Sequence, residues 1–193
     1  MFERALKIFS RGRSSAARIP MMALEECELI AMGPSDIHHL GSFAKSPIKK
    51  GEFIRFMRGD VIDFKGVLRR IKKGKITPDD PLQIDKDLFI DLDPPSLAIN
   101  HSCNPNAGIR ARNELIAICD IHAGEEVTFD YSTTVSCHVN PDAWTMQCRC
   151  NSENCRSSIC NVRSVPKDLL VEYLKMNVLQ SYIIDELSEY LKN

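Results

Sequence analysis

Short apolar runs separated by turn residues cover the middle of the chain, from about residue 27 to residue 131. The runs that predict strands lie at 28–32, 53–57, 61–64, 88–92, 107–112, 115–119 and 127–131. Between them stand turn residues such as Gly51, Gly59, Gly124, Pro78 and Pro105. Only residues 67–73 predict a helix in this region. Short strands of this kind favour a mostly β (α+β) fold of small sheets over a doubly wound sheet.

The pattern becomes helical near the end of the chain. Ser164 is placed to cap a helix whose first turn holds Pro166 and Asp168. Apolar residues then recur at helical spacing, with Leu169, Leu170, Tyr173 and Leu174 in a first helix and Leu179, Ile183, Leu187 and Leu191 in a second. Such a stripe predicts core or docking surface rather than a cofactor site.

The composition is that of a globular chain with room for one domain and a small extension. The chain has 193 residues, of which 44% are hydrophobic and 26% charged, and no apolar run reaches the ~18 residues of a membrane span. The net charge of −1 lacks the basic excess that non-specific nucleic-acid binding uses. We therefore expect no direct nucleic-acid partner, no membrane association, and a monomer or weak dimer.

Residues 1–22 form a basic N-terminal tail, which we expect to be flexible and outside the fold. A transit peptide, a surface-lying amphipathic helix and a partner-binding arm are the alternatives. The tail has no continuous apolar core followed by a small-residue cleavage site, so it does not predict a signal peptide. A cytoplasmic protein is then expected, or a nuclear or host-cell protein if the chain is eukaryotic or a secreted effector.

Eight cysteines give the first indication of chemistry, because four of them crowd into residues 148–160. Without an export signal, such a cluster predicts metal ligands before disulfides. Cys148, Cys150 and Cys155 supply three of the four soft ligands of a tetrahedral zinc site. Spacing alone does not choose the fourth ligand, for which the candidates are Cys103, Cys137, His138 and Cys160.

Three segments, in this order, carry a family resemblance. They are Asn-His-Ser-Cys-Asn-Pro-Asn at 100–106, Glu-Glu-Val-Thr-Phe-Asp-Tyr at 125–131 and Cys-Arg-Cys-x4-Cys at 148–155. Together they resemble the SET-domain protein lysine methyltransferases with a post-SET zinc element. Residues 41–44, Gly-Ser-Phe-Ala, resemble the second half of the family's Gly-x-Gly-x-Phe-Ala start. The resemblance covers roughly residues 27–160, and the tail after it resembles that of compact bacterial members.

The resemblance implies a particular fold and division of the chain. It implies a SET-domain β-clip of small sheets with a pseudoknot, a zinc-bound post-SET flap and C-terminal helices. In this chain the SET catalytic domain would span 23–132, the post-SET flap 133–160 and the C-terminal helical extension 161–193.

The reaction that the resemblance implies is methyl transfer from S-adenosylmethionine to the ε-amine of a lysine in a protein substrate, with a histone as one candidate. A free lysine has a pKa near 10.4, so an apolar channel and a positive sulfonium would have to favour the neutral amine. Tyr131 matches the family's catalytic tyrosine. Phe129 matches the position that limits the number of methyl groups, and phenylalanine there implies di- or trimethylation.

The resemblance also implies which residues bind the cofactor and the metal. The cofactor-binding positions are Gly41, Ser42, Phe43, Asn100, His101, Tyr131 and Trp144. Cys103 becomes the expected fourth ligand of one structural zinc, beside Cys148, Cys150 and Cys155. The adenine-covering role of Trp144 has an equally good alternative, which is plain packing of the flap.

Two departures from the family pattern keep a second hypothesis open. His39 stands where the family has the first glycine of its Gly-x-Gly turn, and Met57 stands where many members carry a tyrosine that contacts the amine. A thioether cannot donate that hydrogen bond. The alternative is therefore a non-catalytic SET-like module that binds a protein partner or the cofactor without turnover. A zinc-binding interaction domain alone would leave segments 100–106 and 125–131 unexplained.

Overall fold

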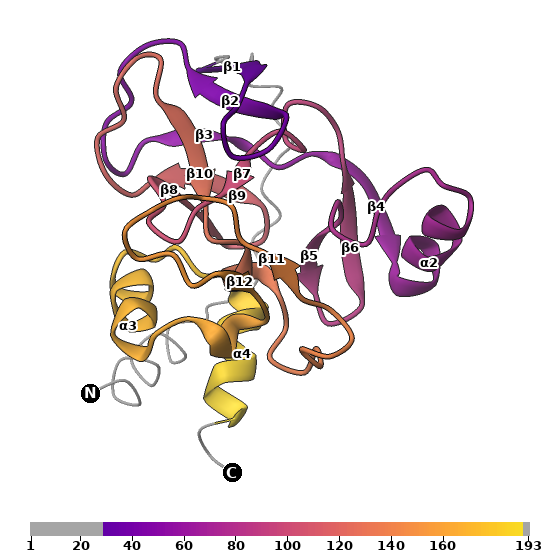
Figure 1. Ribbon diagram of the computed structural model, residues 1–193. Coiled ribbons are helices and arrows are strands. Elements are labelled where there is room, and N and C mark those ends of the chain that lie inside the picture. The colour runs from indigo at the N-terminus through magenta and orange to yellow at the C-terminus, as the bar shows by residue number, and fades with distance from the viewer. Residues whose placement is uncertain (1–28, 191–193) are drawn as a thin grey trace, which may run out of the picture.

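The computed structural model describes residues 29–190 (Figure 1). The predicted basic tail, Cys27 and Leu191 lie outside the described residues. The strands form three small sheets and a two-stranded ribbon, with helices α3 and α4 gathered at the bottom of the view. The prediction of a mostly β fold with C-terminal helices is confirmed. No helix within residues 29–190 has the length and apolar character needed to cross a membrane.

The first sheet is the one that organises the site. Its strand order is β1 (Ile30–Pro34), β2 (Leu40–Ala44), β10 (Glu126–Phe129) and β7 (Asn100–His101). β10 pairs antiparallel to β2, with Val127 opposite Ser42, and parallel to β7, with Phe129 opposite His101. Strand β10 therefore brings together the segments at 41–44, 100–106 and 125–131, which are far apart in the sequence.

The other two sheets have three strands each. One has the order β3 (Phe53–Phe56), β9 (Glu114–Ala117), β8 (Ala107–Arg110), and the other the order β4 (Gly59–Asp63), β6 (Leu88–Leu92), β5 (Leu82–Asp85). Helix α2 (Phe64–Lys72) follows β4 directly and lies beside it at the right of Figure 1. It begins earlier than predicted because the Asp63 carboxylate accepts a 2.7 Å hydrogen bond from Gly66 N and so caps its first turn.

The main hydrophobic core lies between these sheets. Its fully buried members include Ile48, Ile109 and Leu115. Met57 belongs to this core and has no exposed surface. Its backbone pairs with Asn113, whose carbonyl accepts from Met57 N at 2.8 Å and whose side-chain amide donates to Met57 O at 2.9 Å. The packing of Met57 is thus that of an ordinary core side chain.

A second core joins the C-terminal helices to the sheets. After the short 3-10 helix η2 (Val162–Ser164) come α3 (Lys167–Lys175) and α4 (Ser181–Tyr190). Leu174, Leu179 and Ile183 pack with Ile116 of β9 in this core. The fully buried Gln180, between the helices, donates from Nε2 to Gln83 O and to a second backbone carbonyl. The helices are therefore built into the domain and not merely appended to it.

The predicted cap of the first C-terminal helix is wrong. The residue before α3 is Pro166, which makes no side-chain cap hydrogen bond. Ser164 instead ends η2, and its hydroxyl donates back to Asn161 O at 2.8 Å. Ser164 therefore belongs to η2 and does not cap α3. Asp168 does lie in the first turn of α3, as predicted.

Candidate active site

Tyr131 follows β10 after one residue, Asp130, and begins the 3-10 helix η1 (Tyr131–Thr134). Its hydroxyl donates to Ile99 O at 2.8 Å. Its ring lies against Phe129, with 4.8 Å between the ring centroids, and meets His101 edge-on at 5.4 Å. The side chain expected to be catalytic is therefore held at both its ring and its hydroxyl.

The Tyr131 hydroxyl remains protonated at neutral pH. Burial raises its pKa well above the ordinary value, and the nearby carboxylates Asp80, Glu126 and Asp79 raise the pKa further. A neutral phenol can donate one hydrogen bond and accept others. The site thus offers an aligning hydroxyl rather than a phenolate base.

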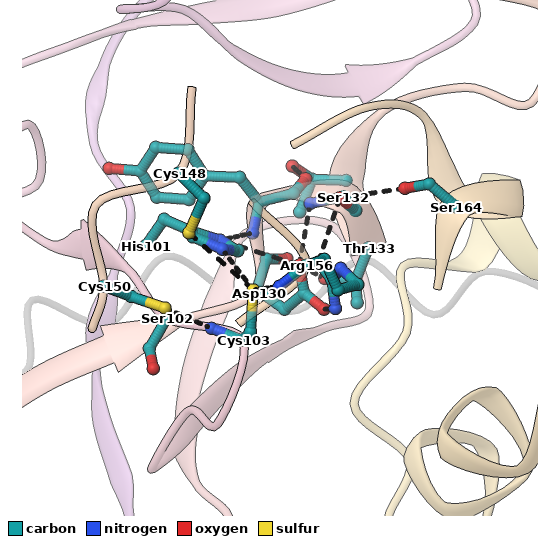
Figure 2. Close-up of polar contacts among 12 residues, drawn as sticks. His101, Ser102, Cys103, Asp130, Ser132, Thr133, Cys148, Cys150, Arg156 and Ser164 are labelled. Carbon is teal, nitrogen blue, oxygen red and sulfur yellow. Dashed lines mark hydrogen bonds and ion pairs between the residues drawn. The ribbon is translucent and has the colours of Figure 1, made fainter. Parts of the chain in front are cut away.

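Figure 2 shows the polar network that surrounds this turn. Asp130 is almost fully buried, and its carboxylate accepts hydrogen bonds from both terminal nitrogens of Arg156, at 2.8 and 2.6 Å. One Asp130 carboxylate oxygen also accepts from Ser132 N at 3.1 Å, which caps η1. The same oxygen lies 3.6 Å from Nδ1 of His101. Asp130 therefore joins the end of β10 to a residue of the cysteine-rich segment.

The hydrogen bonds of His101 define its tautomer. Tyr131 N donates to Nδ1 at 3.1 Å, so the ring proton belongs on Nε2, which lies 3.3 Å from the Cys103 sulfur. Burial lowers the pKa of His101 to about 4, against an opposing effect of Asp130, so the ring is neutral at pH 7. His101 thus supports Tyr131 with one nitrogen and faces Cys103 with the other.

The structure brings four possible metal donors together. The donor atoms of His101, Cys103, Cys148 and Cys150 all lie within 4.8 Å of one another, and the Cys103 and Cys148 sulfurs are 3.8 Å apart. Cys155 is not in this group of four, although it packs against the same small cluster. Segment 100–103 and the cysteine-rich segment thus meet as the resemblance implied, and the complete ligand set stays a prediction.

The donor set fits zinc. Sulfurs on a tetrahedral zinc, each about 2.3 Å from the metal, are about 3.8 Å apart. His101 is poorly suited as a ligand, because coordination through Nε2 would require the proton on Nδ1, where Tyr131 N already donates. His101 is better placed to donate to a metal-bound Cys103, the kind of outer hydrogen bond that orients ligands. This leaves Cys155 as the fourth ligand that best suits the chemistry.

The thiol environments are unequal. Burial raises the pKa of Cys103 and of Cys148. Burial acts in the same direction on Cys150, but hydrogen bonds from Cys103 N and from Ser152 outweigh it and lower the pKa of Cys150 to about 6. Cys150 is therefore the thiol that most readily supplies a thiolate.

The other candidates for the fourth ligand lie elsewhere. Cys137 is buried in the second core, where its donor atom and those of His138 and Glu186 lie within 4.8 Å of one another. Cys160 lies 3.4 Å from the Thr145 hydroxyl, and it lines a cavity of about 370 Å³ together with Cys137 and His138. The three candidates Cys137, His138 and Cys160 are therefore not part of the group formed by His101, Cys103, Cys148 and Cys150.

The predicted cofactor residues on β2 and β7 lie side by side. The Asn100 amide donates to Leu40 O at 2.9 Å and to the Glu126 carboxylate at 2.7 Å. A Cβ atom on Gly41 would overlap a carboxylate oxygen of Glu126 and lie 2.9 Å from Ser35 Cβ, so a larger residue would displace these side chains. Ser42 is fully buried, and its hydroxyl donates to Pro95 O at 3.1 Å. The side chains of Asn100 and Ser42 hold the site together, and most residues of the adjoining turn at 36–40 are exposed.

The remaining two cofactor positions, Phe43 and Trp144, are both half-buried. Phe43 is half-buried on β2, opposite Glu126. Trp144 is half-buried in the same small cluster as Tyr131 and Met146, and its indole nitrogen donates to the Asp79 carboxylate at 3.0 Å. The Trp144 ring therefore reaches from the flap across to the loop that follows α2.

His39 adopts a backbone conformation that suits glycine. Its φ of 34° lies in the left-handed region, and its side chain is exposed against the ring of His38. The turn before Gly41 thus has the shape expected for glycine even though histidine occupies it. The substitution changes what projects from the turn and leaves the left-handed backbone conformation in place.

The chemical character of these residues suits S-adenosylmethionine. The ligand carries an adenine, an amino-acid tail and a positive sulfonium. The site offers the exposed turn at 36–40, the aromatic face of Trp144, and the three carboxylates that raise the pKa of Tyr131 and so suit a cation.

Two residues important for the site were not singled out from the sequence. Asp130 stands inside the 125–131 segment, between Phe129 and Tyr131, and its position beside Tyr131 was the available signal. Arg156 directly follows Cys155, but the spacing of the cysteines says nothing about a neighbouring arginine. Their pairing joins residues 26 positions apart, which local patterns do not reveal.

Comparisons with known proteins agree with this geometry. Residues 39–132 match the family model described as "SET domain". A mouse protein named "Histone-lysine N-methyltransferase NSD3" is 37% identical over 128 residues, which are 60% of this chain and 8% of that protein. A human protein named "Histone-lysine N-methyltransferase, H3 lysine-36 specific" is 33% identical over 145 residues, or 68% of this chain and 5% of that protein. The chain thus spans less than a tenth of the length of these relatives.

A solved structure, the humanized mutant of the Chaetomium thermophilum Polycomb Repressive Complex 2 bound to the inhibitor GSK126, is 26% identical with a TM-score of 0.47. The match covers 54% of this chain and 15% of the solved chain. The matched residues 39–132 include strands β2, β7 and β10, which bring Gly41, Asn100 and Tyr131 together. Residues 39–132 of this chain are a SET domain.

Proposed function

We propose that the chain transfers a methyl group from S-adenosylmethionine to the ε-amine of a lysine in a protein substrate. The observation that carries this proposal is the fixed Tyr131, whose ring contacts Phe129 and His101 and whose neutral hydroxyl is held by Ile99 O. It lies where the two cofactor-side strands, β2 and β7, flank β10. Histones are the proposed substrate class, because the two relatives described above are named histone-lysine methyltransferases.

The residues of the chain contribute mainly by positioning. When bound, S-adenosylmethionine supplies the electrophilic methyl group. Tyr131 aligns the amine and the methyl group with a hydroxyl that does not ionise at neutral pH. The buried Phe129 ring provides an apolar wall that disfavours the ammonium form of the lysine. Because phenylalanine has no hydroxyl to hydrogen-bond the amine, we propose that di- and trimethylation are both accessible.

The metal has a structural role in this proposal. Cys103, Cys148, Cys150 and Cys155 would hold one zinc, which ties the segment after β7 to the flap that carries Trp144. Trp144 would then cover the cofactor from the flap side. Met57 takes no part in catalysis in this proposal, because it is buried in the main core.

The test is methyl transfer by the Tyr131→Phe variant. With radiolabelled cofactor and core histones as substrate, we expect kcat to fall by about 100-fold, since one aligning hydroxyl is lost while the ring packing stays. Tyr173→Phe is the matched control, because the Tyr173 hydroxyl is buried without a hydrogen-bond partner and its removal should leave the rate unchanged.

Two outcomes would contradict the proposal. Equal rates for Tyr131→Phe and the wild type would remove Tyr131 from the reaction. Clear cofactor binding by calorimetry, with no transfer to histones or to the proteins of a cell lysate, would instead support the non-catalytic alternative.

A further inference from the structure

We propose that Arg156 is a positioning residue for methyl transfer: it couples the folding of the cysteine-rich loop to the placement of Tyr131, through Asp130. The inference rests on the proposed function for its catalytic consequence. Its structural basis is that one residue contacts both the cysteine cluster and the turn that carries Tyr131 (Figure 2).

The backbone of Arg156 belongs to the cysteine cluster. Arg156 N donates to the Cys103 sulfur at 3.3 Å, directly after Cys155 in the chain. This hydrogen bond exists only when the loop 148–156 is wrapped against segment 100–103. The position of the Arg156 side chain therefore depends on the loop being folded.

The side chain of Arg156 reaches the catalytic turn. Its two terminal nitrogens bind the two oxygens of Asp130 as a fork, and one of them also donates to the Ser132 hydroxyl at 3.2 Å. Asp130 and Ser132 are the residues on either side of Tyr131. Arg156 thus clamps both ends of the three-residue stretch whose middle residue is Tyr131.

Charge makes this clamp strong. Asp130 exposes 2% of its surface, and the Arg156 side chain exposes 14%. A buried carboxylate without its partner is unfavourable, and the fork geometry adds direction to the charge. When the loop opens, Asp130 loses its cationic partner and is driven toward water, which moves the backbone on both sides of Tyr131.

The clamp also fixes the hydrogen bonds of the Tyr131 backbone. Tyr131 N donates to His101 and Ser132 N donates to Asp130. These two amides should exchange slowly with solvent while the clamp is closed. Their exchange therefore reports the state of the turn without any reference to activity.

The decisive variant is Arg156→Lys, which keeps the positive charge and removes the fork. We expect kcat to fall by about 10- to 100-fold, as for a small misplacement of a reacting group, while KM for the cofactor changes little. Zinc content should stay at the wild-type level. Acrylamide quenching of Trp144, the single tryptophan of the chain, should also be unchanged, because the flap remains closed.

The matched control is Arg149→Lys. Arg149 lies in the same loop, between Cys148 and Cys150, but its side chain is exposed. It should leave kcat and the exchange of the Tyr131 and Ser132 amides at wild-type values. A second test uses Asp130→Asn alone and combined with Arg156→Lys. If the pair acts as a unit, the double variant should lose no more kcat than the worse single variant.

The result that would overturn the proposal is a fully zinc-loaded Arg156→Lys protein with wild-type kcat and wild-type protection of the Tyr131 and Ser132 amides. Losses that multiply in the double variant would also contradict it. If the wild type transfers no methyl group at all, the proposed function fails, but the exchange measurement still decides the clamp: faster exchange at both amides supports it and unchanged exchange rejects it.

Discussion

At the scale of single residues, the two departures from the family pattern have different physical meanings. Met57 is buried in the main core, so its side chain contributes by packing, although its thioether cannot donate a hydrogen bond. His39 keeps a left-handed backbone that its side chain disfavours. One departure has become part of the fold, and the other leaves local strain in an exposed turn.

The strain at His39 predicts that His39→Gly stabilises the protein by about 1 kcal/mol, because glycine adopts positive φ without a steric penalty. The neighbouring His38 does not have a positive φ, so His38→Gly should be neutral or slightly destabilising. Urea denaturation of both variants at neutral pH measures the difference. A loss of stability for His39→Gly would show that the histidine side chain makes a favourable contact that outweighs the strain.

At the scale of elements, sequence patterns located β1, β3, β4, β6, β8, β9 and β10 but missed the other strands, among them β2, β5 and β7. Strand β2 contains glycine and serine, and β7 has only two residues, Asn100 and His101. β7 exists because β10 supplies its partner, and β2 pairs with β10 as well as with β1, so long-range pairing contributes to both. Family resemblance located Tyr131 and Cys103 in the site, whereas the Arg156–Asp130 pair required the three-dimensional arrangement.

Glycine at the start of β4 sets how closely two strands approach. Gly59 has φ 148°, and a Cβ atom there would overlap the backbone carbonyl of Asp91 on β6. We expect Gly59→Ala to destabilise the protein by about 3 kcal/mol, since backbone cannot move aside as a flexible side chain can. Gly74→Ala is the control, because Gly74 also has positive φ but has open space around it and should lose only about 1 kcal/mol. Equal losses of stability for the two variants in thermal unfolding would mean that the positive φ, and not the clash with Asp91, causes the destabilisation.

In the proposed function, one zinc ion would stabilise the flap. We expect the protein to hold about one zinc per chain and Cys155→Ser to lower that content to below about half, measured by elemental analysis after dialysis. Cys119→Ser is the control, because Cys119 is exposed and absent from the cluster. An unchanged zinc content in Cys155→Ser would point to a ligand set without Cys155.

At the scale of the whole molecule, the predicted flap and the predicted helical extension share a core. Cys137 and Val162 pack in the same cluster as Leu174 and Ile183. Glu186 of α4 accepts hydrogen bonds from Ser136 and from Cys137 N. Anything that loosens α4 should therefore loosen the base of the flap as well.

Ile183→Ala tests this coupling. The side chain is fully buried, so we expect a loss of about 2–5 kcal/mol in the free energy of unfolding, together with increased acrylamide quenching of Trp144. The adjacent Ile184 is only partly buried, and Ile184→Ala should lose about 1 kcal/mol with no change in quenching. A large loss of stability with Trp144 unaffected would show that the helices and the flap unfold independently.

The place of β10 in the middle of its sheet has a consequence for protein synthesis. β1, β2 and β7 all leave the ribosome before β10 does, so a nascent chain carries a hairpin and a two-residue segment with no strand to join them. The sheet edge of β2 stays open until residue 129 has emerged. The rate of translation over codons 45–129 thus sets how long this edge is exposed, and the unfinished chain is prone to aggregation during that interval.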